Sequence, residues 1–183
     1  MNEHQETTEK QAVQYGPSMT FYHANAKGTG GALSLGRIPA TLEEEGCLMA
    51  RFANQLTVGN RQGPEPVYPR FDWENKIVVK LNFNDLCKMI QVFRGECEAM
   101  GEEGKGLYHR ASGMVTRINL QHLLEPKPGY SFEVYRTKTT GEELRSRVFL
   151  STDEATGICR IIEDSLALIC FGSPMEARHG VAA

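Results

Sequence analysis

Long apolar runs are missing from this 183-residue sequence, and no stretch approaches the roughly 18 residues that a membrane-spanning helix needs. We therefore exclude a helical integral membrane protein and expect no membrane partner. The first residues, MNEHQETTEKQ, lack both an apolar core and an arginine. We expect neither a secretory signal nor an amphipathic transit peptide there.

Paired cysteine motifs are also missing. The five cysteines include no C-x-x-C pair, and no histidine–cysteine spacing matches a zinc site. An odd number of thiols, several of them within apolar runs, is typical of buried cysteines in a reducing compartment. We expect no metal and no cofactor. We also expect a cytoplasmic protein, with a nucleoid-associated or phage-encoded one as alternatives.

The sequence also lacks a surplus of positive charge. The chain carries 20 basic and 23 acidic residues, which gives a net charge of −3. Bulk charge therefore gives no support to nucleic-acid binding, for which a basic domain is the usual sign. It does not exclude such binding, because a local stripe of cations is sufficient.

Catalytic motifs are absent as well. The glycine-rich segment Lys27–Gly31 lacks the order of a nucleotide-binding loop and is not followed by a helical pattern. No nucleophile-elbow motif is present. The acidic run Glu43–Glu45 is best interpreted as a solvated turn. The sequence therefore predicts that the protein is not an enzyme.

What the sequence does contain is a repeated alternation of apolar and polar residues, which is typical of strands. In the first half, strands are expected at Met19–Ala26, Ala32–Ile38, Cys47–Leu56 and about 76–83. In the second half, they are expected at Leu107–Ala111, Met114–Leu124, Tyr130–Thr137 and Leu144–Leu150. Turn residues separate neighbouring strands, so each half is expected to form an antiparallel sheet.

In each half the fourth strand leads directly into a helical pattern. From Asp85 to about Ala99 apolar residues recur at helical spacing, and Asn84 is placed to cap the start. In the second half, Ser151 and Glu154 form a capping box that opens a helix ending at Gly172. This order predicts an α+β fold, a duplicated four-strand antiparallel sheet plus helix (ββββα-ββββα).

The expected domain organisation follows from this duplication. We expect one domain at 17–172, made of pseudo-repeats at 17–100 and 105–172. The polar segment 1–16 is expected to be a disordered tail, and 173–183 a second tail.

The expected solvent face of the strands combines cations with aromatic rings. Cations track a phosphate backbone and bases stack on aromatic rings, so a sheet bearing both suits single strands. The simpler alternative is that these are ordinary polar surface residues, and that some of the rings belong to the core. The residues are Arg37, Arg51, Lys76, Lys80, Arg117, Arg145 and Arg147, with Phe21, Tyr22, Phe71, Trp73, Tyr108, Tyr135 and Phe149.

Several motifs resemble the Whirly family of single-stranded-DNA-binding proteins. Lys27-Gly28 followed by Ala32-Leu33-Ser34-Leu35 resembles the family's K-G-K-A-A-L-S-V stretch, although this chain has an extra residue and one lysine fewer. Gly46–Ala53 resembles G-F-V-L-L-Q-F-A, and Phe71–Lys76 resembles Y-D-W-x-x-K. Leu81–Ile90 resembles the family's strand-to-helix junction. The second half matches mainly in plan.

The resemblance implies a homotetramer that binds single-stranded DNA largely without sequence specificity, in replication, repair or recombination, or transcription. It implies stacking by Tyr22, Phe52 and Trp73 and phosphate contacts by Lys27, Arg51, Lys80 and Arg110. Ser34 and Asn82 would bond sugars or base edges. For Phe52 and Trp73, the alternative to base stacking is a structural role. The changed glycine-rich stretch leaves assembly beyond a tetramer undetermined.

Alternative functions stay open at this point. The fold is shared with kinetoplastid mitochondrial RNA-binding proteins, so an RNA-binding or annealing protein is one alternative. A non-catalytic protein-interaction scaffold is another, and an uncharacterised hydrolase is a third. The salt dependence of binding separates a nucleic-acid-binding protein from a protein-interaction scaffold, because phosphate binding weakens steeply with added salt and apolar peptide binding does not.

Overall fold

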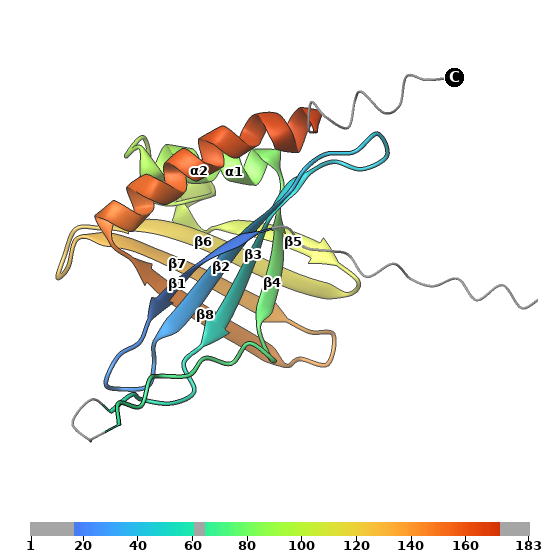
Figure 1. Ribbon diagram of the computed structural model, residues 1–183. Coiled ribbons are helices and arrows are strands. Elements are labelled where there is room, and N and C mark those ends of the chain that lie inside the picture. Colours follow the sequence, from blue (N-terminus) through green and yellow to red (C-terminus); the bar gives the residue numbers. More distant parts are fainter. Residues whose placement is uncertain (1–16, 61–64, 173–183) are drawn as a thin grey trace, which may run out of the picture.

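Two four-stranded antiparallel sheets, each followed by a helix, form the protein in the computed structural model, which describes residues 17–60 and 65–172 (Figure 1). The first sheet contains β1 (Ser18–His23), β2 (Gly31–Ile38), β3 (Cys47–Asn54) and β4 (Ile77–Leu81), in that order. The second contains β5 (Leu107–Ala111), β6 (Met114–Leu123), β7 (Gly129–Thr137) and β8 (Glu143–Leu150), again in order. The helices are α1 (Phe83–Phe93) and α2 (Thr152–Phe171), and a short 3₁₀ turn, η1, spans Glu102–Gly104. The predicted duplicated α+β fold is confirmed, and the tails expected at 1–16 and 173–183 lie outside the described residues.

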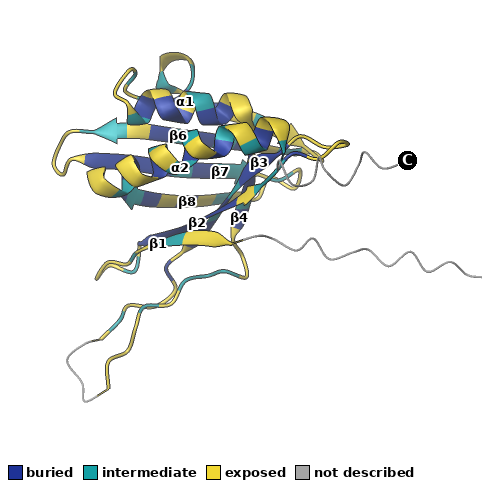
Figure 2. Ribbon diagram, turned by 45° about the horizontal axis from the view of Figure 1, so that its top comes forward, coloured by how far each residue is buried: buried dark blue, intermediate teal, exposed yellow. Residues whose placement is uncertain are grey.

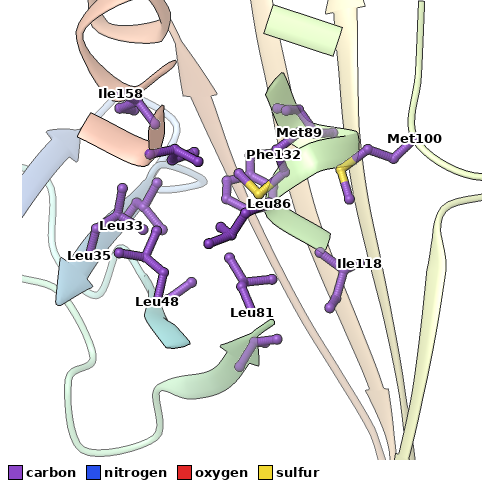
Figure 3. Close-up of a cluster of buried hydrophobic side chains, with 14 of the residues drawn as sticks. Leu33, Leu35, Leu48, Leu81, Leu86, Met89, Met100, Ile118, Phe132 and Ile158 are labelled. Carbon is purple, nitrogen blue, oxygen red and sulfur yellow. The ribbon is translucent and has the colours of Figure 1, made fainter. Parts of the chain in front are cut away.

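The two sheets and both helices share one hydrophobic core. Strands of the first sheet run across those of the second, and the helices lie next to each other against the second sheet (Figures 1 and 2). Figure 3 shows Leu33 and Leu48 of the first sheet, Phe132 of the second, and Leu86 of α1 meeting in this core. Because each sheet turns its apolar face to the same core, its other face points outward. We call these the outer faces.

Alternation along β4 illustrates how the sequence produces these faces. Ile77, Val79 and Leu81 are buried, whereas Lys80 between them is exposed. A strand with period two places alternate side chains on opposite faces, so burying one set exposes the other. The predicted outward position of Lys80 is confirmed.

The start and end of α1 differ from the prediction. Asn82, not Asn84, caps the helix: its side chain accepts from the Asp85 backbone N–H at 3.0 Å, and the Asp85 carboxylate accepts from the Asn82 N–H at 3.0 Å. The helix ends at Phe93, well before Ala99, because Gly95 adopts a positive φ of 73°. Capping therefore begins one residue after β4 ends.

The predicted capping box of α2 is confirmed. The Ser151 hydroxyl accepts from the Glu154 N–H at 3.3 Å, and the Glu154 carboxylate accepts from the Ser151 N–H at 2.8 Å. The helix ends before Gly172, whose φ is 71°. Both helices therefore start with the same reciprocal arrangement, in which the carboxylate three residues after the capping residue closes the box.

Each of these capping carboxylates is met by a histidine from the other half of the chain. His109 of β5 places Nε2 3.0 Å from the Asp85 carboxylate at the start of α1. His23 of β1 places Nε2 3.1 Å from the Glu154 carboxylate at the start of α2. The first strand of each half thus reaches the helix start of the other half, and we call these the cross-half contacts.

Candidate nucleic-acid interface

The outer face of the first sheet brings together most of the predicted binding residues. Strand register pairs Ser34 of β2 with Arg51 of β3, and Lys80 of β4 lies opposite Met49 on the same face. Tyr22 of β1 lies on the same face, in the neighbouring cross-strand row, opposite Ala32 of β2. Two cations and an aromatic ring therefore share one surface, as a single-strand binding sheet requires, whereas Ser34 on the same face is buried and only 7% exposed.

Aromatic rings gather at one end of this face. The Tyr22 ring is 59% exposed, and its centroid lies 5.3 Å from that of Phe71 and 6.2 Å from that of Trp73, with the Trp73 ring edge-on. Ala32 and Ala53 are the nearest neighbours of Tyr22 in its row, and their small side chains leave room for the rings. Tyr22 is the most open of the three rings and has surface left for a stacked base.

The cations of this face occupy different environments. Arg51 is half-buried, and its Nη1 lies where a Cβ at Gly36 would come within 3.0 Å, so the guanidinium lies over that glycine. Lys80 is exposed and has no ion pair among the described residues. Lys80 is therefore the more accessible of the two for a phosphate oxygen.

Two predicted site residues are placed elsewhere by the structure. Phe52 is 1% exposed and packs edge-to-face on Phe132 at 4.9 Å, so its ring belongs to the core and cannot stack on a base. Asn82 uses its side chain to cap α1. Strand alternation explains the burial of Phe52, because its side chain lies on the opposite face of β3 from that of Arg51.

Lys27 and Arg110 lie apart from the outer face of the first sheet. Lys27 is exposed in the turn between β1 and β2. Arg110 is exposed on the outer face of the second sheet, opposite Val115 of β6. The predicted residues are therefore distributed over two surfaces.

A ladder of alternating tyrosine and arginine crosses the outer face of the second sheet. Register places Tyr108, Arg117, Tyr135 and Arg145 side by side on four neighbouring strands. The Arg117 guanidinium lies 4.3 Å from the Tyr135 ring centroid and that of Arg145 lies 4.8 Å from it. Such distances are typical of cation–π contacts. We call these four residues the Tyr/Arg ladder.

Glu133 organises the cations beside this ladder. Its carboxylate accepts a hydrogen bond from the Tyr135 hydroxyl at 2.7 Å and pairs with Arg147 at 3.2 Å and Arg145 at 3.5 Å. Burial raises the pKa of the Tyr135 phenol, and the hydrogen bond to Glu133 raises it further, so the phenol stays a donor at neutral pH. One carboxylate thus pairs with two guanidinium groups.

The ladder borders a hollow of about 420 Å³ whose walls include Tyr108, Val115 and Arg117. Tyr135 is flanked by two guanidinium groups, whereas Tyr108 is 57% exposed. Tyr108 is therefore the ring of the ladder that is open to a base, and Tyr135 positions the arginines. All four residues are among the cations and aromatic rings expected on the solvent face, but none is among the predicted binding residues, because alternation identifies outward residues but not which of them become cross-strand neighbours.

Other functional groups are sparse in the described part of the chain. Residues 17–60 and 65–172 contain no cluster of three His, Cys, Asp or Glu side chains suited to a metal. Within the same residues, no helix combines the length and apolarity needed to cross a membrane.

Comparison with known proteins places this geometry in a structural context. No family model and no curated protein matches the sequence. Among solved structures, WHY1 from Arabidopsis thaliana has a TM-score of 0.67 at 13% identity, covering 94% of this chain and 97% of that one. WHY3 from the same plant has a TM-score of 0.68 at 15% identity, with 93% and 98% covered. The plant transcriptional regulator PBF-2 has a TM-score of 0.64 at 14% identity, with 90% and 85% covered. The chain therefore has a Whirly-like fold.

Proposed function

We propose that this protein is a non-enzymatic single-stranded-DNA-binding protein. The observation that carries the proposal is the Tyr/Arg ladder, in which an open tyrosine and two arginines share one row of an outward sheet face. The Whirly-like fold supports the same conclusion, because the family resemblance in the sequence is to proteins that bind single-stranded DNA. The protein as a whole is slightly acidic, so its affinity must come from local cations and stacking.

The two outer faces would divide the work of binding. On the first sheet, Tyr22 would stack on a base while Arg51 and Lys80 contact phosphates. On the second, Tyr108 would stack while Arg110 and Arg117 contact phosphates. Stacking is worth roughly 1–3 kcal/mol per base and does not distinguish the bases strongly. We therefore propose binding that is largely independent of sequence.

We extend the proposal to assembly. The helices keep apolar surface exposed, with Phe83 45% and Phe171 89% exposed and Leu166 partly so. A homotetramer joined through the helices would cover this surface and leave both outer faces available. We further propose a cytoplasmic role in replication, repair or recombination, or transcription.

Fluorescence anisotropy with labelled single-stranded DNA tests the proposed function. Unlabelled single-stranded DNA, duplex DNA of the same sequence and single-stranded RNA serve as competitors. Duplex hides the base faces, so single strands should compete at least about tenfold better, which corresponds to about 1.4 kcal/mol. Equal competition by duplex would remove stacking from the mechanism.

The same titration separates the alternatives. Stronger competition by RNA than by DNA would favour the RNA-binding function. An absence of binding to either, at low salt, would favour a protein-interaction scaffold, whose apolar contacts weaken little with salt.

A further inference from the structure

The turn between β6 and β7 presents a lysine between two prolines. Its residues are Pro126, Lys127 and Pro128, followed by Gly129, at which β7 begins. Each proline ring fixes its own backbone φ, so the turn has little freedom to carry the lysine elsewhere. Lys127 is exposed, and its ammonium group forms no ion pair with the described residues.

The ring of Phe149 on β8 lies next to this lysine. The Lys127 Nζ atom is 4.9 Å from the centroid of the Phe149 ring, which is a distance typical of a cation–π contact. The same ring lies over Gly129, where a Cβ would come within 2.5 Å of a ring carbon. Glycine at this position therefore leaves the space that the ring occupies. Phe149 is half-buried, so part of its ring is open to a ligand.

Phe149 belongs to the same outer face as the Tyr/Arg ladder. Along β8, Arg145, Arg147 and Phe149 occupy alternate positions and point outward, whereas Ser146 and Val148 between them are buried. Side chains on one face of a strand are about 6.8 Å apart, which is two residues at about 3.4 Å each. The ladder meets β8 at Arg145, so two arginines in regular spacing lead from the ladder to Phe149.

The two open rings of this face, those of Tyr108 and Phe149, lie at opposite corners of the sheet. Tyr108 is on β5, three strands away from β8, which corresponds to about 14 Å at about 4.8 Å per strand. Phe149 lies four residues beyond the ladder along β8, which adds about 14 Å in the perpendicular direction. The two rings therefore cannot stack on the same base, and a strand that follows the cations between them passes over Arg145 and Arg147.

Lys127 and Phe149 together offer partners for both parts of a nucleotide. A base can stack on the Phe149 ring by displacing the exposed ammonium group from it. The displaced ammonium group is then available to a phosphate oxygen, because no described carboxylate holds it. An acidic peptide would neutralise the lysine but would leave the ring without a stacking partner. The pairing of a ring with an unpaired cation therefore favours a nucleotide.

We propose that Lys127 and Phe149 form a second stacking site, the end site, for a nucleotide of a single strand that runs from the Tyr/Arg ladder along β8. The proposal rests on the proposed function and adds a path for the strand. Phe149 stacks on the base, and Lys127 contacts the phosphate. Arg145 and Arg147 contact the phosphates that lie between the ladder and the end site.

Phe149→Leu and Lys127→Gln test the end site by anisotropy with labelled oligothymidine over a range of NaCl concentrations. Phe149→Leu keeps an apolar side chain over Gly129 but removes the ring, so it should weaken binding about fivefold or more with an unchanged salt slope. Lys127→Gln should weaken binding and flatten the slope by about 0.7, the value for one phosphate on a single strand.

An abasic strand of the same length separates the two contacts, because it keeps the phosphates and lacks the bases. On this strand the effect of Phe149→Leu should vanish, whereas the effect of Lys127→Gln should remain. Phe149→Tyr keeps a ring and should restore most of the affinity that Phe149→Leu loses.

Two further variants act as references, and thermal unfolding checks that every variant is folded. Tyr108→Leu removes the open ring of the ladder and should weaken binding independently of the end site. Lys138→Gln removes a lysine from the turn between β7 and β8, where its ammonium group pairs with Glu142 at 2.8 Å. We expect Lys138→Gln to leave affinity and slope unchanged.

Each outcome decides the proposal. If Tyr108→Leu weakens binding while Phe149→Leu or Lys127→Gln binds as the wild type does, the end site is overturned and the proposed function stands. If Phe149→Leu weakens binding of the abasic strand as much as that of oligothymidine, the ring does not stack on a base and the end site is overturned as well. If the wild type binds no single strand, the proposed function falls and the end site falls with it.

Discussion

Neutralising Glu133 is expected to strengthen nucleic-acid binding, even though it removes ion pairs. In the folded protein this one carboxylate contacts the Tyr135 hydroxyl and the guanidinium groups of Arg145 and Arg147, at distances of 2.7, 3.5 and 3.2 Å. Glu133→Gln keeps an acceptor for the phenol but releases both arginines. It also removes the negative charge that repels a phosphate on this face.

The size of the effect follows from the geometry. A unit charge about 6 Å from a phosphate in water repels it by about 0.7 kcal/mol, which is about a threefold change in affinity. If both released arginines then reach phosphates, the plot of log affinity against log salt should steepen by up to about 1.4, at 0.7 per phosphate. Stability should change little, because these ion pairs lie on an outward face where pairs contribute about 0–1 kcal/mol.

Anisotropy with single-stranded DNA at several salt concentrations measures both quantities. Asp164→Asn is the matched control, because it neutralises a carboxylate paired with an arginine on α2, away from both sheets. We expect that control to leave affinity and slope unchanged. Weaker or unchanged binding by a folded Glu133→Gln variant would refute the reasoning, since the outer face of the second sheet would then not be where phosphates lie.

Three other predictions address the first sheet, the start of α1 and alkaline pH. Lys80→Ala and Arg51→Ala should each weaken binding similarly for all sequences and flatten the salt slope by about 0.7, measured in the same titration; wild-type behaviour in both would exclude that face. Asn82→Ala should lower the free energy of unfolding by about 1 kcal/mol in urea, whereas Asn84→Ala should change it little, and the reverse order would contradict the observed cap. Because the folded pKa of Tyr135 is raised above the ordinary value of 10.0, the folded state holds its proton more tightly and stability should fall as pH rises beyond about 10. Tyr135→Phe should make this alkaline loss shallower in thermal unfolding, and equal slopes would count against the assignment.

Much of the fold was predictable because alternation and capping are local signals. The period of two along β4 was sufficient to place Lys80 outward, and the Ser151–Glu154 spacing was sufficient to start α2. The start of α1 could not be predicted in the same way, because Asn82 and Asn84 are both good capping residues and the point where β4 ends decides between them. The predicted extension of α1 to Ala99 was wrong. Cys97 does pack against the core, as its helical spacing suggested, but it does so from the segment that follows the end of α1 at Phe93.

The candidate site was predictable only in part, for a geometrical reason. Alternation places Phe52 and Arg51 on opposite faces of β3, so the two could not share an open surface, and burial selects Arg51 for it. The Tyr/Arg ladder depends on register between four strands, which turn lengths determine and a single sequence does not display. The contact of β8 with the start of β2 and the end of β3 depends on how the two sheets meet, and no local pattern encodes that.

The cross-half contacts have a consequence for how the molecule opens. His109 of β5 packs against the Asp85 carboxylate that begins α1, and His23 of β1 packs against the Glu154 carboxylate that begins α2. If β1 detaches, the helix that loses support is the one at the far end of the sequence. Fraying in either half should therefore register as amide exchange at the helix start of the other, which ties the two halves into one cooperative unit.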